Sequence, residues 1–132
     1  MSELDLEPIE LEGFSLTPSL EAGILSVVFS GKGDLDAVPT LAQFLPKVHQ
    51  QAVLHGVGEV KFDFCALTFM NSSCFKAFVT FIDTAKTIAV DYRIRFVTTT
   101  EHYWQRRSLE ALRRLAMGIV IIQSDQDGSS AS

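Results

Sequence analysis

Short apolar runs alternate with helical stripes along most of the chain. Residues 24–29 form a β-branched apolar run that ends in the glycine-containing residues 30–33, which predicts a strand. A weaker strand is predicted around residues 14–16, with residues 18–23 as the hairpin turn between the two. Residues 37–54 carry apolar side chains at spacings of three and four, which predicts an amphipathic helix.

Polar and proline residues set the expected limits of this first helix. Asp36 is a suitable N-cap, and Pro39 is tolerated in a first turn. Pro46 lies deeper, so we expect it to kink the helix or split it in two. The glycines in residues 55–58 end the element.

The second half of the chain repeats the succession of strand and helix. The elements expected there are a strand at 59–67, a helix that opens at 71–73 and runs to 89, a strand at 92–97, a helix from Trp104 to Leu115 and a buried strand at 119–122. The predicted order is β-β-α-β-α-β-α-β. Such alternation predicts an α/β fold with a mixed, mainly parallel sheet and helices packed on it.

Charge is distributed unevenly between the N-terminus and the rest of the chain. The sequence has 16 acidic and 11 basic residues, a net charge of -5. Residues 1–12 contain five acids and no Lys or Arg, so the remaining 11 acids balance the 11 bases. A neutral body gives no electrostatic case for a nucleic-acid partner. We therefore expect an acidic segment at 1–12, a folded domain at 13–123 and a flexible tail at 124–132.

The acidic segment allows two interpretations, an extra strand or a free arm. Alternation in Leu4-Asp5-Leu6-Glu7 favours strand-like pairing. The chain shows no secretory signal and no apolar run near the ~20 residues of a membrane span, which indicates a cytoplasmic protein without direct membrane insertion. Two cysteines without a CxxC pattern agree with a reducing compartment.

Catalytic and metal-binding patterns are weak. Gly31-Lys32-Gly33 lacks the spacing of a phosphate-binding loop, and Ser72-Ser73 lies outside any G-x-S-x-G elbow. Cys65 and Cys74 lie nine residues apart without flanking ligands. We therefore expect no enzyme activity, no metal and no cofactor. The histidines, predicted to lie at the surface, are His49, His55 and His102. A small enzyme or ligand carrier would need some of them to converge in a cleft with a nucleophile or carboxylate.

The third predicted helix is rich in arginine. It carries Arg106, Arg107, Arg113 and Arg114, with Glu110 between them. The cluster could receive an acidic partner or the chain's own acidic N-terminus. The interpretation favoured from sequence is the solvated face of an amphipathic helix.

Two segments, taken together, resemble the STAS domain family, and within it the bacterial anti-sigma-factor antagonists. Residues 29–41, F-S-G-K-G-D-L-D-A-V-P-T-L, are similar to the family's strand-end G-x-x-D and first helix, with Asp34 at the acidic position. Residues 67–75, L-T-F-M-N-S-S-C-F, are similar to the family's L-x-F-M-D-S-S-G-L, which closes a strand and opens the second helix. The element order fits the family over residues 13–123.

The resemblance implies a non-catalytic partner in a signalling switch. In typical members an anti-sigma kinase phosphorylates the second serine of the motif, which is Ser73 here, with Ser72 as the secondary candidate. The unmodified domain binds the kinase or a related regulator, and a phosphatase resets the switch. The implied partner-binding residues are Asp34, Phe69, Met70, Asn71, Ser72, Ser73, Cys74 and Phe75.

Elementary helix chemistry agrees with both a switching and a capping role for the serines. An anion is favoured at a helix N-terminus, so a phosphate on Ser73 would be tolerated there while adding close to two negative charges. Asn-Ser-Ser is also an ordinary capping sequence, in which one good cap contributes about 1 kcal/mol. For Ser72 we favour capping.

Two residues depart from the family's pattern. Asn71 replaces Asp, which keeps the capping geometry and removes a charge, and Cys74 replaces Gly. The alternative function is therefore a degenerate STAS domain, a constitutive scaffold or subunit of a larger sensor or transporter complex without phosphorylation. Cys74 in a first helical turn could be a reactive thiol of lowered pKa, although burial as a small apolar group is favoured.

Overall fold

The computed structural model describes residues 4–88 and 90–124, apart from the side chain of Tyr103. The strands within these residues are β1 (Ile9–Leu11), β2 (Phe14–Glu21), β3 (Ile24–Gly33), β4 (Glu59–Met70), β5 (Arg93–Thr98) and β6 (Val120–Ser124). The helices are α1 (Val38–Leu54), α2 (Ser72–Thr87) and α3 (Tyr103–Leu115), and a 3-10 turn, η1 (Leu35–Ala37), precedes α1. The predicted alternation of elements is confirmed, with β1 added at the front.

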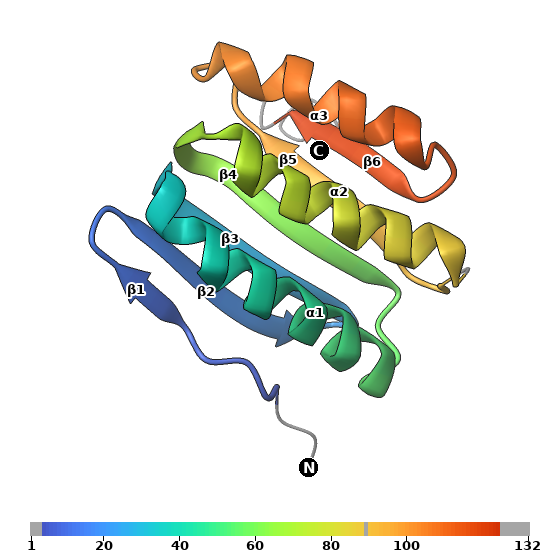
Figure 1. Cartoon of the computed structure of the whole chain (residues 1–132). Coiled ribbons are helices and arrows are strands. Elements are labelled where there is room, and N and C mark those ends of the chain that lie inside the picture. Colours follow the sequence, from blue (N-terminus) through green and yellow to red (C-terminus); the bar gives the residue numbers. More distant parts are fainter. Residues whose placement is uncertain (1–3, 89, 125–132) are drawn as a thin grey trace.

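The six strands form one sheet whose spatial order is the order of the sequence. Strands β1, β2 and β3 are antiparallel neighbours, and β3 to β6 are parallel. Helices α1, α2 and α3 lie side by side on one face of this sheet (Figure 1). The predicted mixed, mainly parallel α/β fold is confirmed, as a layer of helices on a sheet.

The hairpin between β2 and β3 is tighter than predicted. Its turn is Ala22–Gly23, with φ angles of 53° and 78°, and residues 18–21 belong to β2. The expected turn over residues 18–23 is therefore wrong. Strand β1 pairs only as far as Leu16, so Pro18 lies where β2 is the edge of the sheet, a position at which proline is tolerated.

The N-terminal segment packs on the domain. Residues 9–11 pair with residues 14–16, and the Leu6 side chain is buried. The Asp5 backbone N–H donates to Oε1 of Gln51 at 2.9 Å. The strand interpretation therefore holds for residues 9–11, whereas the alternating residues 4–7 make no strand.

Helix α1 begins and continues differently from expectation. Asp34, rather than Asp36, is the cap, and it caps η1 before α1 begins. Pro46 lies inside α1, which runs without interruption. The predicted split is wrong because Leu45 and Val48, on either side of the proline, are both buried in one core and hold the two halves together.

Phenylalanines form the centre of the core. Phe29, Phe62, Phe64, Phe78 and Phe96 are fully buried between the sheet and the helices. The Phe29 and Phe64 ring centroids lie 5.1 Å apart at 89°, an edge-to-face contact of the kind that aromatic quadrupoles favour. This interlocked cluster fixes β3, β4, β5 and α2 relative to one another.

Strand β4 is longer than predicted and overhangs β5. Its pairing with β5 ends at Asp63 opposite Val97, while its pairing with β3 continues to Met70 opposite Gly33. The overhang carries residues 64–70 past β5 toward the start of α2. At the other end of the chain, Ser124 is still part of β6, and the rest of the predicted tail lies outside the described residues.

Candidate functional site

The two segments that carry the family resemblance meet at the carboxyl ends of β3 and β4. Gly33 and Met70 are register partners, and the Asn71 backbone N–H donates to the Gly33 carbonyl oxygen at 2.8 Å. The Cys74 thiol donates to the Asp34 carbonyl oxygen at 3.4 Å. We call the resulting surface, formed by Asp34 and residues 69–75, the docking face.

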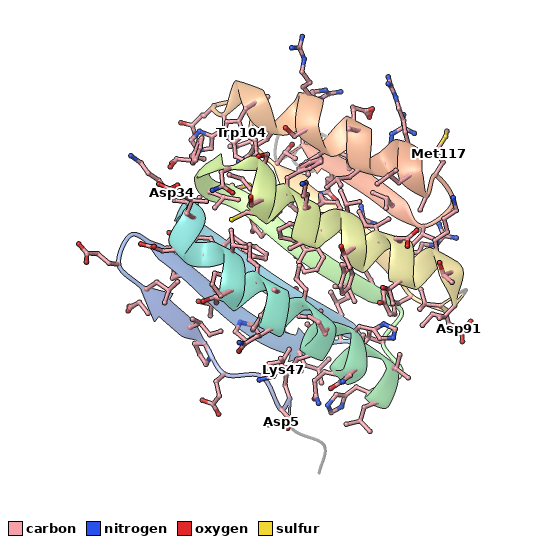
Figure 2. All side chains as sticks on the ribbon, in the orientation of Figure 1. Asp5, Asp34, Lys47, Asp91, Trp104 and Met117 are labelled. Carbon is pink, nitrogen blue, oxygen red and sulfur yellow. The ribbon has the colours of Figure 1, made fainter. Side chains whose placement is uncertain are left out.

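Asp34 projects from the end of β3. Its side chain is exposed, and Oδ1 accepts a hydrogen bond from the Leu35 backbone N–H at 2.8 Å. The carboxylate therefore presents charge to solvent while it caps η1. Figure 2 shows Asp34 at the same end of the molecule as Trp104, with Asp91 and Met117 at the opposite end.

Asn71 is the N-cap of α2. Its extended backbone (φ -77°, ψ 169°) lets Oδ1 accept from the Cys74 backbone N–H at 2.8 Å. Asparagine thus performs the capping that the family's aspartate would perform. The capping role predicted for Ser72 is wrong, because Ser72 is the first residue of the helix and is exposed.

Ser73 is the second residue of α2 and is half-buried. In an α-helix the N–H groups of the first residues have no acceptor within the helix, so those of Ser72 and Ser73 point out of its N-terminus. Together with the positive end of the helix dipole, they favour negative charge at this position. A phosphate on Ser73 is therefore compatible with the helix.

Cys74 is fully buried beneath the docking face. Burial raises the pKa of its thiol to about 11, and the negative charge of Asp34 adds to the rise. The hypothesis of a reactive thiol with a lowered pKa is therefore wrong. The side chain occupies the space between the first turn of α2 and the Asp34 backbone, where the family's glycine would leave a gap.

The apolar residues of the docking face differ in exposure. Phe69 is 45 % exposed, whereas Met70 and Phe75 are half-buried and pack against the core. Leu35, next to Asp34, is 68 % exposed and was missed from sequence. The sequence feature that indicates its exposure is its position directly after the capping aspartate and outside the apolar stripe of α1.

Two side chains of α3 support the overhang of β4. The Gln105 carboxamide is fully buried and donates through Nε2 to the carbonyl oxygens of Phe64 at 2.6 Å and Leu67 at 2.7 Å. The Trp104 indole Nε1–H donates to the Thr68 carbonyl oxygen at 2.9 Å. Sequence reasoning missed both residues, although a polar glutamine on a buried helix face is the signal for such a role.

The three histidines are half-buried, and two of them have a side-chain hydrogen-bond partner. His49 Nδ1 lies 2.8 Å from the Tyr92 hydroxyl, and His55 Nε2 lies 3.2 Å from Oε1 of Gln51. Each of the three therefore keeps part of its surface exposed, as predicted. Across residues 4–88 and 90–124, no cluster of three or more His, Cys, Asp or Glu could hold a metal ion. No helix in that same part of the chain is long and apolar enough to cross a membrane.

Solved structures with the same fold include several regulatory proteins. An anti-sigma factor antagonist from Mycobacterium paratuberculosis matches at TM-score 0.64 and 17% identity, over 89% of this chain and 92% of the other. The anti-sigma factor antagonist SpoIIAA, unphosphorylated, matches at TM-score 0.57 and 14% identity, over 88% and 94%. SpoIIAA of Bacillus also matches in its phosphorylated form, at TM-score 0.54.

A third protein with this fold comes from a complex of two proteins. A chain from the complex of the diguanylate cyclase SiaD with its activator SiaC, from Pseudomonas aeruginosa, matches at TM-score 0.60 and 18% identity. The match covers 84% of this chain and 91% of the other. No protein-family model matches the sequence, and a comparison with curated proteins gives no match. At these identities the comparisons establish the fold, which is that of the anti-sigma-factor antagonists.

Proposed function

We propose that this chain, which has the fold of the anti-sigma-factor antagonists, is a regulatory protein-binding module of the cytoplasm. In this proposal a protein partner, an anti-sigma kinase or a related regulator, binds the docking face, and phosphorylation of Ser73 releases it. The proposal draws support from the fold and from the motif at residues 67–75.

One observation carries the proposal. The hydrogen bond from Asn71 N–H to the Gly33 carbonyl oxygen and the contact of Cys74 with Asp34 hold the two motif segments together as one surface. The surface combines an exposed carboxylate at Asp34, an exposed ring at Phe69 and a serine hydroxyl at Ser73. Apolar anchors beside a few polar groups are the usual composition of a transient interface.

Phosphorylation would act through charge. A phosphoserine carries close to two negative charges at neutral pH. Added beside Asp34, they would impose a desolvation cost on a partner that buries Phe69, and they would repel any acidic group that the partner places there. The helix N-terminus would accommodate the phosphate, so binding would be lost while the fold persists.

The scaffold alternative has an observation in its favour. Cys74 fills the position of the family's glycine and is buried against the Asp34 backbone. Ser73 is itself half-buried, which limits the access of a kinase active site to its hydroxyl. In that alternative the docking face binds a partner permanently, and Ser73 is never modified.

Phosphopeptide mapping of the protein, purified from its own host in growing and stressed cells, separates the two functions. Phosphate on Ser73 that changes with growth conditions supports the switch. Full coverage of the peptide with Ser73 unmodified in both conditions contradicts the switch and leaves the scaffold.

Binding assays with the partner recovered by affinity purification extend the test. We expect Ser73→Asp to abolish binding and Ser73→Ala to keep it, with melting temperatures close to that of the wild type. Thr80→Asp is the matched control, because Thr80 is exposed on the same helix but lies seven residues beyond Ser73, outside the docking face. In a scaffold, binding survives all three changes. Phe69→Ala weakens binding in either case, and unaltered binding of that variant would exclude the docking face itself.

A further inference from the structure

A groove of about 280 Å³ lies between α1 and α2, which are neighbours in the helical layer (Figure 1). The buried side chains of Leu41, Leu45 and Phe81 form its floor. Ala42 and Pro46 line it from α1, where both are exposed. The groove is therefore open to solvent above an apolar floor. It is separate from the docking face, because none of its lining residues belongs to that surface.

Short side chains keep the groove open. Ala42 and Pro46 lie four residues apart on α1, and Ala77 lines the groove from α2. Proline is the least favourable residue in the interior of a helix. Because Pro46 is exposed, packing of the core does not account for it. A longer side chain at any of these three positions would extend over the floor and fill the groove.

His49 supplies a hydrogen-bond donor to the groove lining. Its Nδ1 lies 2.8 Å from the hydroxyl of Tyr92, which is buried. Burial raises the pKa of Tyr92, so the hydroxyl keeps its proton. Within residues 4–88 and 90–124, His49 Nδ1 is the one hydrogen-bond partner of this hydroxyl, which therefore donates to it. The ring proton of a neutral His49 is then on Nε2, on the other side of the ring from Tyr92.

The groove lining carries no formal charge. Its polar members besides His49 are Gln50, Thr80 and Thr84, and none of the described lining residues is Lys, Arg, Asp or Glu. A charged ligand would lose its hydration above the apolar floor without meeting an opposite charge. The lining therefore favours a neutral ligand with an apolar body.

We propose that this groove binds a small neutral aromatic molecule whose hydrogen-bond acceptor receives the Nε2–H of His49. An apolar cavity of about 150 Å³ holds one benzene ring, so a groove of about 280 Å³ has the size for two fused rings. The ring of Phe81 in the floor offers an aromatic contact to such a ligand. The inference is independent of the proposed function, because the docking face contributes nothing to the groove.

Quinoline and naphthalene are the probes, because they have the same shape and differ only in one ring nitrogen, the acceptor. The intact 15N-labelled protein is titrated with each at pH 8, where quinoline is neutral. We expect quinoline to bind saturably, with amide shifts concentrated in residues 41–50 and 77–84. Its affinity should exceed that of naphthalene about fivefold, the gain from one neutral hydrogen bond. The absence of a saturable shift in those residues overturns the proposal.

Two variants fill the groove from opposite walls. We expect Ala42→Leu and Ala77→Leu each to weaken quinoline binding at least tenfold. Ala42 is exposed, so its variant adds a side chain without overpacking the core. Ala111→Leu is the matched control, because Ala111 is also an exposed helical alanine but lies on α3, away from the groove. Undiminished binding by both groove variants, or equal weakening by the control, overturns the proposal.

A third variant tests the donor. His49→Phe keeps a ring in the lining and removes the N–H, so we expect quinoline and naphthalene to bind it equally. The ratio of the two affinities is measured within one variant, which separates the lost hydrogen bond from a change in stability. Circular dichroism confirms that the variant is folded. A fivefold preference that persists in this variant overturns the assignment of His49.

A charged analogue tests the neutrality of the ligand. N-methylquinolinium has the same two rings as quinoline but carries a fixed positive charge and has no acceptor. We expect it to bind at least tenfold more weakly than quinoline, at the same pH and ionic strength. Equal binding of the two would overturn the proposal of a neutral ligand with an acceptor.

Discussion

The side-chain amide of Gln105 donates to the carbonyl oxygens of Phe64 at 2.6 Å and Leu67 at 2.7 Å. Strand β4 has lost its pairing with β5 at this point, because the ladder between them ends at Asp63 opposite Val97. Gln105 therefore takes the place of the missing strand. Through this contact, α3 holds the segment that leads into the docking face.

We expect Gln105→Leu to destabilise the protein by about 2–4 kcal/mol, because two buried carbonyl groups would lose their donor. Leucine is chosen because it conserves most of the buried volume of the glutamine side chain. Urea unfolding measures the change in the free energy of unfolding. Gln43→Leu is the matched control, because Gln43 is exposed on α1. A loss no larger than that of the control would mean that the carbonyls find other partners.

The cap of α2 gives a prediction with opposite outcomes for two variants. Asn71→Ala removes the acceptor for the Cys74 N–H and should cost about 1 kcal/mol. Asn71→Asp keeps the acceptor and adds a negative charge at a helix N-terminus, which should stabilise by about 0.3–1 kcal/mol at low salt. Thermal unfolding compares the two. An alanine variant with the melting temperature of the wild type would show that the Asn71 side chain contributes no cap.

Cys74 predicts a loss of stability at alkaline pH. Below pH 9 the thiol is protonated in both the folded and the unfolded chain. Between pH 9 and about 11 the unfolded chain releases a proton that the folded chain retains, so stability falls as pH rises. Chemical denaturation across this range measures the fall, which Cys74→Ala should reduce. A variant with the same pH slope as the wild type contradicts the assignment.

Position 31 accommodates glycine and no residue with a side chain. Its φ is +94°, and a Cβ atom there would overlap the carbonyl oxygen of Gly13, which also accepts from the Lys32 N–H at 2.8 Å. We expect Gly31→Ala to cost more than about 2 kcal/mol through backbone strain and displacement of the β1–β2 turn. Gly118→Ala is the control, since a Cβ at Gly118 meets nothing within 4 Å. Similar melting temperatures for both variants would refute this account.

Most of the fold could be predicted from sequence because local signals agreed with tertiary packing. The apolar stripe of α1, the Asn71 cap and the β-branched run of β3 each place polar and apolar groups where the fold needs them. The turn predicted at Pro18 is wrong, because proline indicates a turn unless it lies in a strand at the edge of a sheet. Whether β2 has an unpaired edge depends on the length of β1, and the local sequence pattern does not predict that length.

The site was predictable only in part. The segments at Asp34 and residues 69–75 could be paired through their resemblance to two motifs of one family, and the parallel register of β3 and β4 brings them together. The roles of Gln105 and Trp104 could not be predicted, because their partners are backbone carbonyls more than 35 residues away in the sequence. Every residue type carries a backbone carbonyl, so the sequence does not show which carbonyl a distant side chain will bind.

The sheet's spatial order repeats the order of the sequence, from β1 to β6. During synthesis each new strand can therefore add to an edge that already exists, and no later strand has to insert between two earlier ones. Pairings between neighbours in sequence keep the loops that must close short, which favours rapid folding. The β1–β3 sheet can form while the rest of the chain is still being made, and β6 joins last.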